Sequence, residues 1–122
     1  MIKEVFPSIF SWSRYSEEKK LDFNGYFLIN NNESIIIDPP ELNKDEEKEL
    51  LSLININFSS PLKAILLTNI HHERASHLLK DLFSVPVWVN EFDKHNLEMP
   101  TANTFTGGEK LFCEIESIQL EA

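Results

Sequence analysis

The feature that most constrains the fold is an uninterrupted apolar run, Ala-Ile-Leu-Leu at residues 64–67, which follows the turn-forming sequence Ser-Ser-Pro at residues 59–61. A short apolar run bounded by turn residues is typical of a strand that is covered on both faces. Such a strand has to lie inside a sheet with other elements packed against it. The run is also far too short to span a bilayer, so we expect a soluble protein.

A β-hairpin is predicted upstream of this strand. Residues 26–29 and 34–38 are rich in β-branched and aromatic side chains, and they flank the polar segment 30–33. This arrangement indicates two strands joined by a turn. The second strand should end at Pro39 and Pro40, because neither residue can donate a hydrogen bond to a neighbouring strand.

Two helices are also predicted. The first should begin after Asn43, which can form a capping box with Glu46 three residues later. Its buried stripe is expected to consist of Leu50, Leu51, Ile54 and Phe58. The second helix should follow the central strand, and its apolar residues at helical spacing are Ala75, Leu78, Leu79, Leu82 and Phe83. At about 100° per residue, His77 falls on the opposite side of this helix and is expected to be solvated.

Two further strands complete the pattern. Residues 85–89 form a short apolar run in which Pro86 indicates an edge strand or the first residue of a strand. Gly107 and Gly108 then predict a turn into a last strand at about residues 110–120. The alternation of strands and helices predicts one α/β layered domain over residues 1–122, with helices packed on a sheet.

Charge and cysteine content narrow the partners and the compartment. The chain has 11 Lys and Arg against 20 Asp and Glu, a formal net charge of −9, which argues against a nucleic acid or an anionic membrane as partner. Cys113 is the single cysteine and cannot form an internal disulfide, so the cytoplasm is the expected compartment. No targeting segment is visible. Without a helix start or a histidine beside it in sequence, Cys113 is expected to be an inert thiol.

The polar stretch after the central strand is the place where chemistry is most expected. It reads Thr-Asn-Ile-His-His-Glu-Arg at residues 68–74, and it leaves the carboxyl end of a strand, where α/β proteins bind ligands. His71, His72 and Glu73 are candidate metal ligands, because imidazole and carboxylate groups suit zinc and similar ions. On residue types alone, a metal site and an ordinary polar helix start both remain open.

Several segments, taken in order, resemble the metallo-β-lactamase fold superfamily. They are residues 24–29, 35–39, 65–68, 86–89 and 105–111, and the resemblance extends over residues 22–120. Residues 10–13 and 21–25 resemble an offshoot of that superfamily with an eroded metal motif. The resemblance implies the N-terminal half of an αββα sandwich, that is, a mixed sheet with helices on one face.

The metal loop of that superfamily reads T-H-x-H-x-D-H, and this chain departs from it. Thr68 keeps its place, Asn69 stands where the first histidine belongs, and His71 matches the second histidine. Glu73 replaces the aspartate, and Arg74 replaces the last histidine.

These departures weigh against a dinuclear centre. Asn69 is a poor zinc ligand beside imidazole. The guanidinium of Arg74 at about 5 Å from a divalent ion, with an effective dielectric constant of about 20, would repel it by about 6–7 kcal/mol. We therefore expect no resident cofactor, or at most one zinc or similar ion on His71, His72 and Glu73. Asn69 and Asp38 would then support the site without ligating the ion; on residue types alone, Asp38 is equally consistent with capping the loop.

The remaining metal ligands of the superfamily come later in its chains than residue 122, so a shortened or half domain is expected here. An apolar face of its sheet would be left uncovered, which predicts a homo-oligomer. The leading hypothesis is a degenerate metallo-β-lactamase-fold protein with a binding or structural role. The alternatives are a metal-dependent hydrolase of ester or thioester substrates, and a metal-free module that binds a small molecule near Asp38 and Asn69.

Overall fold

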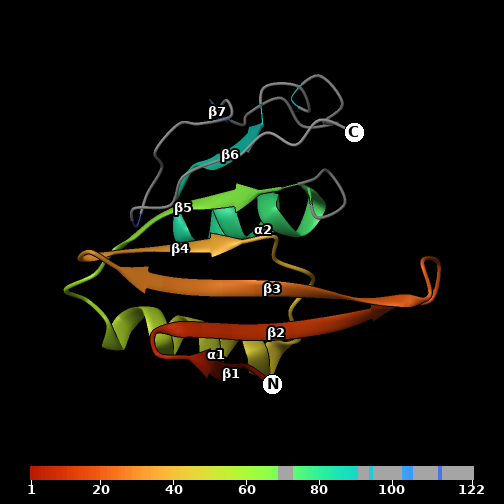
Figure 1. The fold of residues 1–122 in the computed structure, drawn as a ribbon, viewed down its shortest axis with the longest axis horizontal. Helices are drawn as coiled ribbons and strands as arrows, with labels where there is room; N and C mark the ends of the chain where they lie inside the picture. Colours follow the sequence, from red (N-terminus) through yellow and green to blue (C-terminus); the bar gives the residue numbers. More distant parts are fainter. Residues whose placement is uncertain (69–72, 91–93, 95–102, 106–112, 114–122) are drawn as a thin grey trace.

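The computed structural model describes residues 1–68, 73–90, 94, 103–105 and 113, and within them the chain forms one mixed sheet and two helices (Figure 1). The strands are β1 (Lys3–Phe6), β2 (Ile9–Ser16), β3 (Leu21–Asn30), β4 (Glu33–Ile37), β5 (Leu62–Leu67), β6 (Val87–Asn90) and β7 (Asn103–Phe105). The helices are α1 (Lys44–Ile56) and α2 (Glu73–Phe83). Neither of these helices is long and apolar enough to cross a lipid bilayer.

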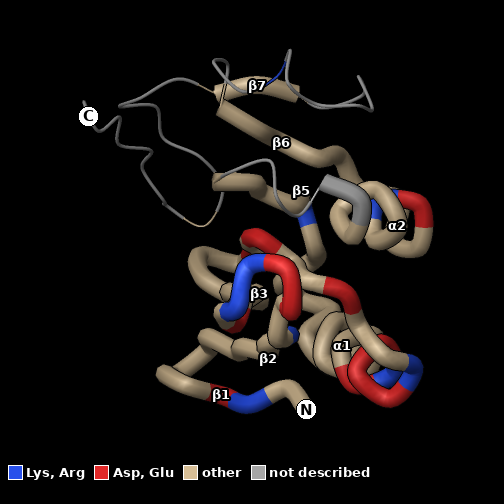
Figure 2. The backbone as a smooth tube through the Cα atoms, turned by 90° about the vertical axis from the view of Figure 1, so that its right-hand side faces the viewer, with Lys and Arg blue, Asp and Glu red and all other residues tan. Residues whose placement is uncertain are grey.

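The sheet has its seven described strands in sequence order, β1 to β7. The pairs from β1 to β4 are antiparallel, and those from β4 to β7 are parallel. Both helices lie on the same side of the sheet, α1 beside the antiparallel half and α2 beside the parallel half (Figure 2). The predicted fold class, an α/β layered mixed sheet with helices on one face, is therefore confirmed.

The hairpin is confirmed and is longer than predicted. β3 pairs with β4 from Tyr26 opposite Ile37 to Asn30 opposite Glu33. Asn31 and Asn32 at the turn have φ angles of 54° and 61°. This left-handed conformation is common for asparagine in tight hairpin turns. β3 begins at residue 21, and its residues 21–28 pair with β2, a strand that the sequence pattern did not predict.

The first helix starts as predicted, but its buried face is narrower. Asn43 Oδ1 accepts a hydrogen bond from Glu46 N at 2.8 Å, and Glu46 Oε1 accepts one from Asn43 N at 3.0 Å. Leu50 is fully buried, whereas Leu51 is 45% exposed. Phe58 lies beyond the end of the helix and is 84% exposed, so the predicted four-residue stripe was wrong at Leu51 and Phe58.

The second helix is rotated relative to its apolar stripe. Ala75, Ser76 and Leu79 are buried against the rest of the protein, while Leu78 is 63% and Leu82 49% exposed. Because this rotation also changes which polar residues are covered, His77 is buried and only 8% exposed. The prediction of a solvated His77 was therefore wrong.

The β6 strand begins at Val87, directly after Pro86, and it pairs with both β5 and β7. Both predicted alternatives were therefore wrong, because β6 is not an edge strand and Pro86 is not its first residue. The carbonyl oxygen of Pro86 accepts a hydrogen bond from Ile65 N at 2.9 Å, so the proline contributes its acceptor where it cannot donate. The predicted strand at 110–120 lies outside the described residues except for Cys113, which has a φ of 58° and lies outside the strands.

The core has two parts, one on each face of the sheet. The larger part lies between the sheet and the helices, and its buried residues are Trp12, Phe27, Ile36, Leu50, Ile65, Leu67, Leu79, Val85, Val87 and Val89. On the other face, Ile35, Ala64 and Leu66 pack with Cys113 and are at most 4% exposed. The expectation that this face is uncovered was wrong for these residues, because the single chain buries them. The homo-oligomer stays a prediction.

Candidate functional site

The candidate site lies where the parallel strands end. β4 and β5 are paired in parallel, with Ile36 opposite Ile65 and Ile37 opposite Leu66, so their carboxyl ends share one edge of the sheet. The residues that follow are Asp38 after β4 and Thr68 after β5. This edge is the place where open α/β sheets form ligand crevices.

Asp38 joins the two strand ends. Its backbone N donates to the carbonyl oxygen of Leu66 at 2.9 Å. Its carboxylate accepts a hydrogen bond from Thr68 N at 2.7 Å on Oδ1 and one from the Thr68 hydroxyl on Oδ2. Both carboxylate oxygens therefore hold the first residue of the loop, which is the loop-capping role that the sequence left open.

The Asp38 backbone is left-handed, with a φ of 47°. This conformation is unfavourable for most residues, and aspartate and asparagine adopt it more readily than others. A residue in such a conformation persists only where its surroundings hold it. Here three hydrogen bonds, to Leu66 and Thr68, do so.

The segment after Asp38 packs closely against β3. The sequence pattern did not predict this contact. Gly25 lies opposite Trp12 in the sheet, and a Cβ atom on Gly25 would come within 2.6 Å of Pro40 Cδ and 3.1 Å of Trp12 Cζ2. Trp12 Nε1 donates to the carbonyl oxygen of Pro40 at 3.4 Å. The signal in the sequence was a glycine inside a strand, which often marks a close approach of another segment.

The other predicted site residues are less completely described. Asn69, His71 and His72 lie outside the described residues. Glu73 is the first residue of α2, and its side chain is not among those described. Within the described part of the chain, no group of three or more His, Cys, Asp or Glu side chains could hold a metal ion.

A buried carboxylate, Glu46, lies at a different place and is structural. It is 2% exposed and accepts from the Met1 amine at 2.7 Å as well as from Arg14 Nη2. Burial acts to raise its pKa, but hydrogen bonds from the Met1 amine and from Asn43 N, with the positive charges of Arg14 and the amine, outweigh it. The pKa of Glu46 is therefore lowered, and its charge ties the start of α1 to β2 and to the Met1 amine.

Cys113 is the other perturbed group. It is 2% exposed, and burial raises the pKa of its thiol, with the nearby Glu33 carboxylate acting in the same direction. A hydrogen bond from Asn30 Nδ2 to the Cys113 carbonyl oxygen, at 3.0 Å, holds this residue at the turn of the hairpin. A raised pKa leaves little of the reactive thiolate at neutral pH, in keeping with the expected inert thiol.

Comparison with known families identifies the class of protein. A sequence model of the metallo-beta-lactamase superfamily matches residues 2–122. This chain therefore belongs to the metallo-beta-lactamase superfamily, as the sequence resemblance implied. A search of curated protein sequences gave no match.

Solved structures show the same fold. The DIM-1 metallo-beta-lactamase exposed to ceftazidime is 23% identical with a TM-score of 0.71, and the match covers 93% of this chain and 55% of that one. The metallo-beta-lactamase from Pontibacter korlensis is 16% identical with a TM-score of 0.67, covering 93% and 56%. The one from Hirschia baltica is 13% identical with a TM-score of 0.61, covering 93% and 57%. The chain thus spans about half the length of the structures it matches.

Proposed function

We propose that this chain is a metallo-β-lactamase-fold protein that binds a ligand at the carboxyl edge of β4 and β5 without the superfamily's dinuclear hydrolytic centre. The observation that carries the proposal is the donor set of the loop after β5. Asn69 and Arg74 occupy the positions of two histidines in the superfamily's metal motif, and Glu73 occupies that of the aspartate.

The chemistry of these residues does not fit two metal ions. An amide is a weak ligand beside imidazole. A guanidinium is permanently charged and cannot ligate, so Arg74 contributes a positive charge where a ligand for the second ion would be needed. The same charge, at the second residue of α2, favours an anionic group on the ligand.

The contacts that hold the start of the loop support a binding site at this edge of the sheet. The Asp38 carboxylate still holds Thr68, and Gly25 still allows Pro40 to pack closely on β3. These contacts fix the entrance of the loop and depend on no metal. A loop with a rigid entrance and a changed donor set is consistent with a binding role.

The second candidate is a hydrolase of esters or thioesters with a single ion. The observation that favours it is the run of three potential ligands, His71, His72 and Glu73, directly after the anchored Thr68. A bound ion would supply a hydroxide at neutral pH and polarise the substrate carbonyl. We assign no other residue of this chain as a ligand of that ion.

Metal analysis after purification without chelator tests the proposal. The protein as it exists should hold less than one equivalent of zinc, while the triple variant Asn69→His, Glu73→Asp, Arg74→His, which restores the motif, should hold more. Close to two equivalents in the unaltered protein would overturn the proposal. Thioester turnover that is lost in both His71→Ala and His72→Ala would replace it with the hydrolase.

A further inference from the structure

Among the residues that the structure describes, no element covers the apolar side chains at two positions of α2. Leu78 and Leu82 are spaced one helical turn apart and are 63% and 49% exposed, although Leu79 between them is buried. Leucines at this spacing form one ridge on the surface of a helix. The ridge borders a groove between α2 and α1.

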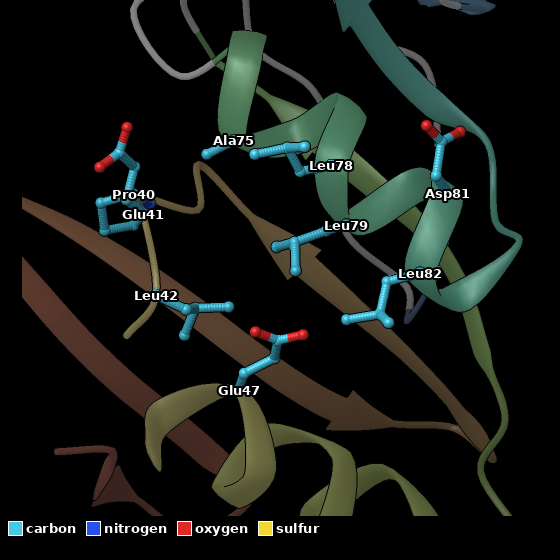
Figure 3. Close-up of a pocket in the computed structure, with 9 residues that line it drawn as sticks. All are labelled: Pro40, Glu41, Leu42, Glu47, Ala75, Leu78, Leu79, Asp81 and Leu82. Carbon is cyan, nitrogen blue, oxygen red and sulfur yellow. The ribbon is translucent and has the colours of Figure 1, made fainter. Parts of the chain in front are cut away.

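This groove has a volume of about 720 Å³ and is formed by both helices and by the segment that leads into α1. Its lining residues are Pro40, Glu41, Leu42, Glu47, Ala75, Leu78, Leu79, Asp81 and Leu82. Leu42 from the segment before α1 and Leu79 and Leu82 from α2 project into the space between the helices, and Glu47 rises into it from α1 (Figure 3). The floor is thus apolar.

The described charged residues that line the groove are all acidic. Glu41, Glu47 and Asp81 are among its nine lining residues, and none of the nine is Lys or Arg. Lys44 and Lys48 line a smaller hollow that shares Glu47 and Leu82 with the groove. An occupant of the groove therefore meets the carboxylates of Glu41, Glu47 and Asp81.

From this combination we propose that the groove docks an amphipathic helix of a partner protein, with leucine-like residues on one face and Lys or Arg along its flanks. An apolar floor between two helices accepts the side-chain ridge of a third helix. The carboxylates at its margin attract positive flanks and repel negative ones. This inference is independent of the function proposed for the loop.

The charge argues against a second copy of this chain as occupant. The chain has a formal net charge of −9, and pairing two copies through this groove would bring Glu41, Glu47 and Asp81 of each toward the other. Like charges across an interface oppose association. A cationic helix removes the same repulsion.

The test uses the whole 122-residue protein and fluorescein-labelled helical peptides of about 18 residues. One peptide carries leucines at i, i+3, i+4 and i+7 with flanking lysines, and a second has glutamate at every lysine position. Fluorescence anisotropy at low salt should show the lysine peptide bound at least about tenfold more tightly than the glutamate peptide. Equal binding of the two peptides would overturn the proposal.

Variants locate the binding. Leu78→Asp should weaken the binding of the lysine peptide by about tenfold or more. The double variant Glu47→Lys, Asp81→Lys should bind the glutamate peptide more tightly than the lysine peptide. The matched control, Lys44→Glu with Lys48→Glu, alters the same helix outside the groove and should leave the preference for the lysine peptide in place. Circular dichroism and thermal unfolding verify that each variant is folded.

Two results would contradict the assignment. Unchanged peptide binding in a folded Leu78→Asp variant would place the peptide elsewhere. A dimer of the unaltered protein in light scattering that is lost in Leu78→Asp would assign the groove to a second copy. If Leu78→Asp fails to fold, the double variant Glu47→Lys, Asp81→Lys still tests the proposal, because Asp81 is exposed and Glu47 lines the groove.

Discussion

The carboxylate of Asp38 accepts two hydrogen bonds from Thr68, a residue 30 positions later in the chain, through the Thr68 backbone N–H at 2.7 Å and the Thr68 hydroxyl. This pair ties the end of β4 to the end of β5 at the edge where the candidate site lies. The contact is local in space and distant in sequence. It is therefore the part of the site that mutation can probe most directly.

Two substitutions of Asp38 should destabilise the protein by different amounts. Asp38→Ala removes both hydrogen bonds and places alanine at a φ of 47°, and it should cost about 2–3 kcal/mol of unfolding free energy. Asp38→Asn tolerates the same φ and keeps one acceptor, so it should cost about 1 kcal/mol. Urea unfolding measures both. An Asp38→Ala variant as stable as the unaltered protein would show that the pair is not a stabilising contact.

Thr68→Val separates the two hydrogen bonds, because it removes the hydroxyl and keeps the N–H. It should cost about 1 kcal/mol, and in the Asp38→Ala background almost nothing further. Urea unfolding of the two single variants and the double variant gives this coupling energy. Strict additivity would mean that the hydroxyl contact is absent in solution.

Gly25→Ala should be poorly tolerated, because its Cβ atom would lie 2.6 Å from Pro40 Cδ. We expect a loss of about 1–3 kcal/mol, since the clash is with a rigid ring and the neighbouring backbone. Combining it with Pro40→Ala, which removes the ring, should recover part of the loss. The control Asn24→Ala, at an exposed position of the same strand, should change stability little. A Gly25→Ala protein of unaltered thermal midpoint would contradict the packing described here.

Glu46 should make stability depend on pH. Because the folded state lowers its pKa from the ordinary value of 4.5, the unfolded state binds the proton more readily. The stabilisation is then present above the unfolded pKa and is lost as the pH falls through the folded pKa. Glu46→Gln should cost about 2 kcal/mol at pH 7 and progressively less below about pH 4.5.

Urea unfolding at pH 7 and in the acid range measures this difference, with Glu18→Gln at the exposed β2–β3 turn as control. The control should track the unaltered protein at both pH values. A deficit of Glu46→Gln that stays constant with pH would show that the buried charge is not the source of the stabilisation.

Cys113 should react slowly with a thiol reagent in the folded protein, because it is 2% exposed and burial raises its pKa. Reaction with Ellman's reagent should accelerate by orders of magnitude in denaturing urea. The measurement is clean because the sequence contains a single cysteine. Rapid labelling without denaturant would contradict the packing of Cys113 on Ile35, Ala64 and Leu66.

The elements that the sequence predicted well depend on neighbouring residues. The capping box of Asn43 and Glu46 closes within four residues, and the turn at Asn31 and Asn32 depends on the backbone freedom of asparagine. The β2 strand was not predicted; it pairs with residues 21–28 of β3, which include the polar residues Asp22 and Asn24. Its pairing is satisfied only when the chain is folded.

For the candidate site too, some features could be predicted from the sequence and others could not. Several segments in order along the chain indicated its superfamily, and the residues of the loop from Thr68 to Arg74 showed which donors differ. The hydrogen bonds between Asp38 and Thr68 could not be predicted, because they depend on the parallel pairing of β4 with β5, which brings the two strand ends together.

What the sequence determined by itself is therefore the order of the elements from β3 to β6, the capping box and the hairpin turn, and the kind of residue at each position of the loop. These follow from backbone preferences and hydrophobic spacing over a few residues. The tertiary structure alone decided how α2 is rotated, so that His77 is buried and Leu78 exposed, and how closely Pro40 approaches Gly25. The physical reason is that burial depends on which surfaces the packed layers present to each other, and helical periodicity leaves that rotation free.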